Sequence, residues 1–163
     1  MPELVPPHGS NEVLPLLVSG DEQKQEIKRA ETLKRVPLSS REVSDLFMFG
    51  MGAYTPLNGF MNEAEWRGVC DEMRMPDGVF WPIPITLSAS KNLASSIEVG
   101  ESIALCDESS QDILAMMNVC EKYEIDKLHE CAAVYKTTDY AHPGVKKVMD
   151  QGEVNLSGPL KIL

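Results

Sequence analysis

Aromatic residues, basic charge and long hydrophobic runs are all scarce in this sequence. Phe, Trp and Tyr make up 6% of the 163 residues, and 15 Lys plus Arg face 25 Asp plus Glu, which gives a formal net charge of −10. Such a chain repels the phosphates of nucleic acids and anionic lipid surfaces. No segment approaches the roughly 18 apolar residues that a membrane-spanning helix needs. The composition therefore argues against general nucleic-acid binding and predicts no membrane span.

Paired cysteine motifs are also missing. The four cysteines are widely spaced, and none belongs to a C-x-x-C pattern: Cys70, Cys106, Cys120 and Cys131. The first twenty residues lack the basic start and apolar core of a secretory signal. We therefore expect reduced thiols, buried as small hydrophobic side chains, in a cytoplasmic protein.

Motifs for phosphate handling and nucleophilic catalysis do not occur. The sequence contains no G-x-x-x-x-G-K-[ST], no G-x-G-x-x-G and no G-x-S-x-G. Gly50-x-Gly52 lacks a third glycine and follows a predicted helix, so we interpret it as a helix end and turn. The scattered acidic residues are expected on solvated helix faces and at helix starts. A catalytic carboxylate pair is not predicted.

Metal ligands do not follow the spacing of a zinc site. His129, Glu130 and Cys131 are consecutive, and residues two apart on a helix point in different directions. His8 and His142 stand alone in proline-containing loops. We expect no metal site, and we interpret His142, directly before Pro143, as a helix-start residue.

Periodicity and cap residues predict short helices that do not alternate regularly with short strands. We expect one helix over 22–35 and another from Pro143 to Gly152. Three more are expected to begin at cap residues: at a Ser39-x-x-Glu42 capping box, at Asn62 and at Asp126. Their expected buried side chains are, in the same order, Val43, Leu46 and Phe47; Trp66, Val69, Cys70 and Met73; and Leu128, Cys131, Ala132 and Tyr135. Expected strands are 13–18, 81–87 at a sheet edge or with a bulge because of two prolines, 101–106 and 113–120 as a hairpin, 153–156, and 160–163 after a 157–159 turn. The fold class is α+β, with a small curved or barrel-like sheet.

Four separated segments together resemble ATP sulfurylase (sulfate adenylyltransferase). They occur in the order of that family's N-terminal domain and extend over essentially the whole chain: Pro6-Pro7-His8-Gly9, Gly52-Ala53-Tyr54-Thr55-Pro56-Leu57-Asn58-Gly59-Phe60-Met61, Phe80-Trp81-Pro82-Ile83-Pro84-Ile85-Thr86-Leu87, and Val134 to Val145. The closing Ser157 to Leu163 is similar to the strand that leads out of that domain.

The resemblance implies a PUA-like α+β domain over residues 1–163. It also implies an enzyme that interconverts ATP and sulfate with adenylyl sulfate and pyrophosphate. In the family, the phosphate clamps lie in the following domain, on a Gln-x-Arg-Asn-Pro-x-His-x-x-His signature that this sequence does not contain. No catalytic, cofactor-binding or metal-binding residue is therefore carried over to any position here. MgATP would belong to the catalytic domain of the parent enzyme, and the expected partners are that domain and further copies in a homo-oligomer.

Individual residues of the resembling segments are interpreted as structural. Lys136 stands where the family often has glycine, which suggests a backbone without positive φ at this position. Trp81 is expected in the core. The segments 6–9 and 139–144 are expected to fix loops and helix starts, although contact with a catalytic domain or a subunit interface is the alternative. The basic residues Lys28, Arg29, Lys34 and Arg35 are expected on an ordinary helix surface.

Two other functions remain open from the residues. A PUA-like fold also suits an RNA-binding module, although the −10 charge opposes it. A stand-alone interaction domain that docks on a separate catalytic chain is the second. The apolar ending, residues 160–163, suggests that the chain continues in its parent protein or ends in a docked strand.

Overall fold

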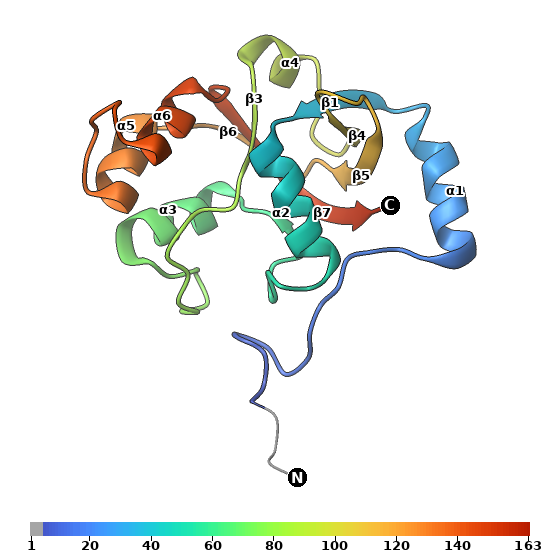
Figure 1. Ribbon diagram of the computed structural model, residues 1–163, viewed down its shortest axis with the longest axis horizontal. Coiled ribbons are helices and arrows are strands. Elements are labelled where there is room, and N and C mark those ends of the chain that lie inside the picture. The colour runs from blue at the N-terminus through green and yellow to red at the C-terminus, as the bar shows by residue number, and fades with distance from the viewer. Residues whose placement is uncertain (1–4) are drawn as a thin grey trace. The chain divides into compact units, whose positions relative to one another are not determined.

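The computed structural model describes residues 5–163, whose helices and strands group into two units (Figure 1). The first unit contains the residues up to Phe60, Gly100–Asn118 and Gly158–Leu163. The second contains Met61–Val99 and Val119–Ser157. The last strand, β7 (Val154–Ile162), contributes its first half to the second unit and its last half to the first.

A mixed sheet forms the centre of the first unit. β1 (Lys34–Leu38) runs parallel to β4 (Ser102–Asp107), and β4 forms an antiparallel pair with β5 (Ile113–Asn118). β5 and the short β2 (Gly59–Phe60) both pair antiparallel with the end of β7. The helices of this unit are α1 (Gly20–Ala30) and α2 (Ser40–Gly50).

One glycine permits the pairing of β2 with β7. A Cβ atom on Gly59 would lie 1.9 Å from the carbonyl oxygen of Gly158, far inside van der Waals contact. Only a residue without a side chain fits at this close approach of two backbones.

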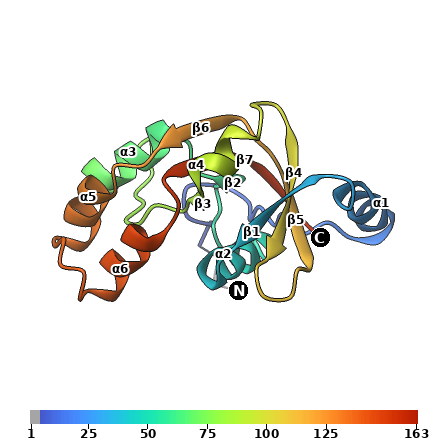
Figure 2. The same cartoon turned by 90° about the horizontal axis from the view of Figure 1, so that it is seen from above.

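Helices dominate the second unit. They are α3 (Glu63–Glu72), α4 (Lys91–Ser95), α5 (Lys127–Glu130), which continues into a π-helix (Cys131–Tyr135), and α6 (Pro143–Asp150). Figures 1 and 2 both show α5 and α6 side by side. β3 (Leu87–Ala89) and β6 (Glu121–Glu124) pair antiparallel with the first half of β7.

Cap residues predicted from the sequence begin the helices as expected. Ser39 and Glu42 form the capping box of α2, and Asn62 forms another with Glu65 at α3. The Asp126 side chain accepts the amide of His129 at the start of α5. These polar contacts satisfy amide groups that a helix start leaves without an intrahelical partner, so they fix where the chain turns into helix.

The predicted helix over 22–35 is wrong at both ends. α1 is N-capped at Ser19, begins at Gly20 and ends at Ala30. Lys34 and Arg35 belong to β1, and Pro37 also lies inside that strand. Pairing with β4 over the full length of β1 outweighs the helical propensity of these residues.

Several strand predictions are also corrected. Of the expected strand 81–87 only Leu87 is in a strand, as the first residue of β3, because Pro82 and Pro84 lack the amides that a ladder needs. The neighbouring Phe80 makes an isolated bridge with Arg74. The segment 13–18 makes only one bridge, from Leu17 to Ile162. The expected 157–159 turn is instead extended strand within β7. The elements α4 and β6 were not expected.

Four of the side chains predicted above to be buried are exposed: Phe47 is 65% exposed, Met73 41% and Leu128 60%, and Ala132 is exposed as well. In α2 the buried residues are Glu42, Asp45, Leu46, Phe49 and Gly50, so Phe47 lies on the opposite side of the helix. The i, i+4 spacing of Val43 and Phe47 therefore indicated the wrong face. Trp66, Val69, Cys70 and Trp81 are buried as predicted.

The helices and strands do not alternate as in a doubly wound sheet, so the α+β prediction is confirmed. No helix among residues 5–163 is long and apolar enough to cross a bilayer.

Candidate functional site

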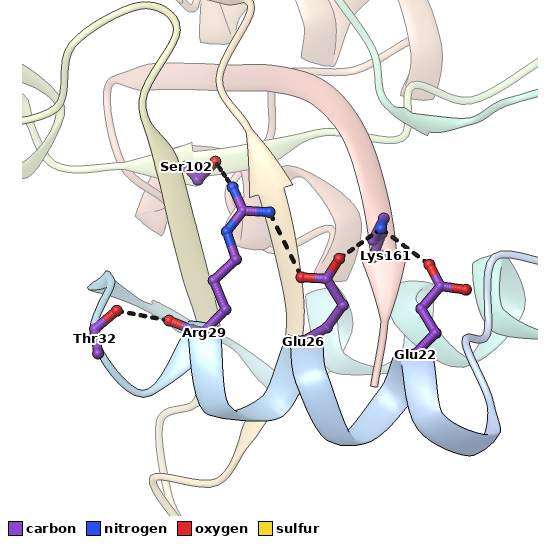
Figure 3. Close-up of polar contacts among 6 residues, drawn as sticks. All are labelled: Glu22, Glu26, Arg29, Thr32, Ser102 and Lys161. Carbon is purple, nitrogen blue, oxygen red and sulfur yellow. Dashed lines mark hydrogen bonds and ion pairs between the residues drawn. The ribbon is translucent and has the colours of Figure 1, made fainter.

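A cluster of charged residues connects α1 with strands of the first unit (Figure 3). Lys161 on β7 donates to Glu22 at 3.0 Å and to Glu26 at 2.6 Å, both on α1. Glu26 also pairs with Arg29 at 3.5 Å, and Arg29 donates to the hydroxyl of Ser102 on β4 at 3.0 Å.

The electrostatics of this cluster are those of a structural contact. The hydrogen bond from Lys161, with its charge and that of Arg29, lowers the pKa of Glu26. The two carboxylates in turn raise the pKa of Lys161. The two carboxylates compensate the positive charge of the Lys161 ammonium, which therefore attracts a phosphate or sulfate only weakly. We interpret the cluster as a structural contact that attaches α1 to β4 and β7.

The predicted basic cluster does not form one surface. Arg29 lies in the group just described, whereas Lys34 on β1 pairs with Glu101 at 3.1 Å. Arg35 is on the same strand and exposed. The prediction of an ordinary helix surface is therefore wrong for Lys34 and Arg35, which are strand residues.

A buried polar pair lies in the core of the second unit. The indole N–H of Trp66 on α3 donates to a carboxylate oxygen of Glu130 on α5 at 2.7 Å, and both residues are at least 95% buried. The ring of Tyr123 packs on Trp66 at 6.0 Å between centroids, and its hydroxyl donates to the carbonyl of Met61. These contacts join α3, α5 and β6.

The cysteines remain thiols throughout residues 5–163, as predicted. Cys70, Cys106 and Cys131 are buried as predicted, whereas Cys120 is exposed, so the prediction of burial is wrong for Cys120. Burial raises the pKa of the Cys70, Cys106 and Cys131 thiols, and the carboxylate of Glu130 adds to the effect at Cys70. A protonated, buried thiol is not a nucleophile or a ready metal ligand.

The histidines considered as metal ligands point to separate places. His129 contacts Asp71 through Nε2 at 2.6 Å, while the neighbouring Glu130 faces Trp66 and Cys131 is fully buried. Within the described part of the chain, no three His, Cys, Asp or Glu side chains gather as ligands would.

His142 has the structural role that the sequence predicted. Its Nδ1 accepts the amides of Gly144 and Val145 at 3.2 and 3.4 Å, so it caps α6, with Pro143 in the first turn. A Cβ on Gly144 would lie 2.5 Å from the ring of Tyr135, which explains the glycine. This part of the 134–145 segment is therefore explained by packing and capping.

Lys136, in the same segment, corrects a prediction. Its φ is +57°, the left-handed conformation that favours glycine. The prediction that the backbone lacks positive φ at this position is therefore wrong. The residue ends the π-helix as its C-cap, where the chain must turn away from the helix.

The predicted Gly50-x-Gly52 helix end is confirmed. Met51 is the C-cap of α2, and Gly52 has a φ of +77°. A Cβ on Gly52 would lie 2.5 Å from a methyl group of Val13, so the N-terminal segment passes directly over this turn.

Two surface hollows do not match an anion site. One is lined by Ser39, Ser40, Asp107 and Glu108, whose carboxylates repel anions. The other contains Arg67 and Arg74, but Arg67 pairs with Glu63 at 3.0 Å and Arg74 donates to the carbonyl of Gly78 at 2.8 Å. Within residues 5–163, neither hollow presents an arginine or lysine that lacks a protein partner.

Comparison with known proteins shows the family of the chain. The model of the PUA-like domain family matches residues 5–163. The sulfate adenylyltransferase of Syntrophobacter fumaroxidans is 58% identical over 165 residues, covering 100% of this chain and 40% of that protein. The sulfate adenylyltransferase of Chlorobaculum tepidum is 56% identical over 160 residues, covering 98% of this chain and 40% of that protein.

A solved structure shares the fold. The hexameric APS kinase from Thiobacillus denitrificans superimposes with a TM-score of 0.72 at 23% identity, over 98% of this chain and 27% of that one. The chain thus spans about two fifths of the length of the curated relatives it matches.

Proposed function

This chain belongs to the PUA-like domain family, and we propose that it is the N-terminal domain of a sulfate adenylyltransferase. The observation that carries the proposal is identity of 50–58% to proteins of that name along the whole chain, which nonetheless makes up only about 40% of each. The parent enzyme would interconvert ATP and sulfate with adenylyl sulfate and pyrophosphate.

The chemistry of this reaction would lie outside residues 1–163. In-line attack of sulfate on the α-phosphorus of ATP needs cationic groups that stabilise the phosphates and hold the reactants in line. The lysines and arginines of the charged cluster and the second hollow are already paired with protein groups. These residues do not fit MgATP, so we assign nucleotide and magnesium binding to the remainder of the enzyme.

The role proposed for this domain is structural: folding, packing against the catalytic domain, and contacts in a homo-oligomer. We propose a cytoplasmic location, which the thiol state of the four cysteines supports. The −10 charge opposes nucleic-acid and anionic-membrane partners. Tight RNA binding that weakens steeply with added salt would contradict this part of the proposal.

An assay of ATP formation from adenylyl sulfate and pyrophosphate tests the proposal. The full polypeptide encoded by the natural gene should form ATP, and residues 1–163 alone should not. Circular dichroism of the isolated 163-residue chain is the control for fold, because an unfolded chain would also be inactive. Turnover by the purified 163-residue chain would show that the reactive site lies within it and would overturn the assignment.

A further inference from the structure

Two segments of the first unit contain no charged residue and nevertheless expose large apolar side chains. Between Val13 and Gly20, and again between Leu46 and Asn62, no residue is charged, in a protein in which 25% of residues are. Large apolar side chains of these two segments are nevertheless exposed to solvent: Val13 55%, Leu14 40%, Leu17 56%, Phe47 65% and Met51 63%. We call these five residues the apolar face.

The two segments of the apolar face are held together by hydrogen bonds. The amide of Leu16 donates to the carbonyl of Phe49 at 3.1 Å, and the amide of Leu14 donates to the hydroxyl of Thr55 at 2.9 Å. Val13 packs over Gly52, directly after Met51. Phe47 and Met51 are four residues apart and therefore project from the same side of the end of α2. The face is thus a defined surface of this unit.

Isolated apolar residues are normal on protein surfaces, but a contiguous group marks an interaction surface. Phe and Met are also among the residues that protein interfaces favour, whereas charged residues are depleted from interface cores. The apolar face contains Phe47 and Met51, and the two segments that form it carry no charged residue.

The end of β7 lies beside this face. Leu17 forms a bridge with Ile162: the amide of Ile162 donates to Leu16, and the amide of Val18 donates to Ile162, each at 2.9 Å. A polypeptide that continued past Leu163 would leave the sheet next to Leu17. In the proposed parent enzyme about 60% of the chain would be this continuation, since residues 1–163 match only 40% of the relatives.

We propose that the apolar face is the surface on which the following part of the same polypeptide, the catalytic domain, packs. This inference rests on the proposed function and adds the surface that joins the two parts. Short covalent connection keeps a neighbouring domain at a high effective concentration, so a face next to the connection is covered first by that domain. Phe47 and Met51 are its central contacts because they are the most exposed of the five residues.

Methionine oxidation in the natural full-length polypeptide tests this proposal. Peroxide oxidises methionines according to their exposure. Met51, 63% exposed here, should react faster than Met73, 41% exposed in the second unit, if nothing covers either. The proposal predicts the reverse order, with Met51 slower than Met73 because burial under the catalytic domain blocks access to its sulfur. Peptide mass spectrometry separates the two sites, and buried Met61 is a slow internal reference.

Charged substitutions in the full-length polypeptide give the second readout. Phe47→Glu should split its thermal unfolding into two transitions, because the domains no longer stabilise each other, while the oligomeric mass stays unchanged. Val99→Glu is the matched control, since Val99 is 59% exposed and lies in the second unit. It should unfold like the parent.

The oxidation and substitution experiments distinguish packing of the catalytic domain on the apolar face from an uncovered face and from contact with a second copy. Faster oxidation of Met51 than Met73 in a long, active enzyme overturns the inference and leaves the proposed function intact. Met51 protection that disappears on dilution, together with a Phe47→Glu change in oligomeric mass, overturns it in favour of a second copy. A natural polypeptide of only 18.0 kDa overturns both the inference and the proposed function.

Discussion

Replacing Trp66 with phenylalanine removes the donor of the buried hydrogen bond to Glu130. The bond is 2.7 Å long and its two residues are 2% and 5% exposed, so water does not replace the lost donor. A hydrogen bond to a charged group contributes about 1.5–3 kcal/mol. The smaller ring adds about 1 kcal/mol for the space it leaves. We expect the free energy of unfolding to fall by about 3 kcal/mol, a large share of the roughly 5–15 kcal/mol typical of a whole domain.

Urea unfolding of residues 1–163, followed by circular dichroism, measures this change. A loss of this size corresponds to a fall of about 6–12 °C in Tm for a chain of this length. Glu124→Gln is the control for the Glu130→Gln variant described below. Both variants remove a carboxylate, but the Glu124 side chain is 78% exposed in its pair with Lys91. Exposed pairs contribute about 1 kcal/mol or less, so this variant should change little.

A double-mutant cycle isolates the bond itself. Glu130→Gln removes the buried charge, so in the Trp66→Phe background it should be less destabilising than in the parent by about 1.5–3 kcal/mol. Additive effects of the two substitutions would refute the reasoning, since they would show that the Trp66–Glu130 contact contributes nothing specific.

Three further substitutions test other local features. His142→Ala should lower the free energy of unfolding by about 1 kcal/mol through loss of the α6 cap, and His142→Asn, which keeps an acceptor, should lose less; equal losses in urea titrations would contradict capping. Lys136→Gly should raise stability by about 0.5–1 kcal/mol because glycine accommodates the φ of +57°, and a loss in the same titration would show that the lysine side chain matters more. The pKa of Glu26 is lowered in the fold, so its contribution is fully present above the ordinary value of 4.5 and is lost as pH falls through the lowered pKa. Lys161→Met should therefore flatten the fall of Tm on the acid side of pH 4.5, and an unchanged acid profile would exclude this pair as its cause.

Signals that act within a few residues predicted the structure well. The capping boxes at Ser39 and Asn62, the proline in the first turn of α6 and the β4–β5 hairpin all depend on neighbours in sequence. Long-range pairing decided the elements that were predicted wrongly. Lys34 to Leu38 became a strand because β4, about seventy positions later, offered a partner.

The buried face of a helix could be predicted where the spacing of its apolar residues fits only one face. In α2 the apolar residues Val43, Leu46, Phe47 and Phe49 suit two faces, and the sequence alone chose the wrong one. The absence of charge from Leu46 to Asn62 was visible in the sequence and is the signal that would have identified the apolar face. The lack of catalytic motifs was visible as well. The family followed from motifs spread along the chain, because each motif by itself is weak.

The intact mass of the polypeptide made from its own gene tests the central claim most directly. Residues 1–163 have a mass of 18.0 kDa and correspond to 40% of the relatives, and 18.0 kDa divided by 0.40 gives about 45 kDa. We predict a polypeptide near that mass, with an Arg-Asn-Pro-x-His sequence beyond Leu163. A polypeptide of 18.0 kDa that ends at Leu163 would contradict it.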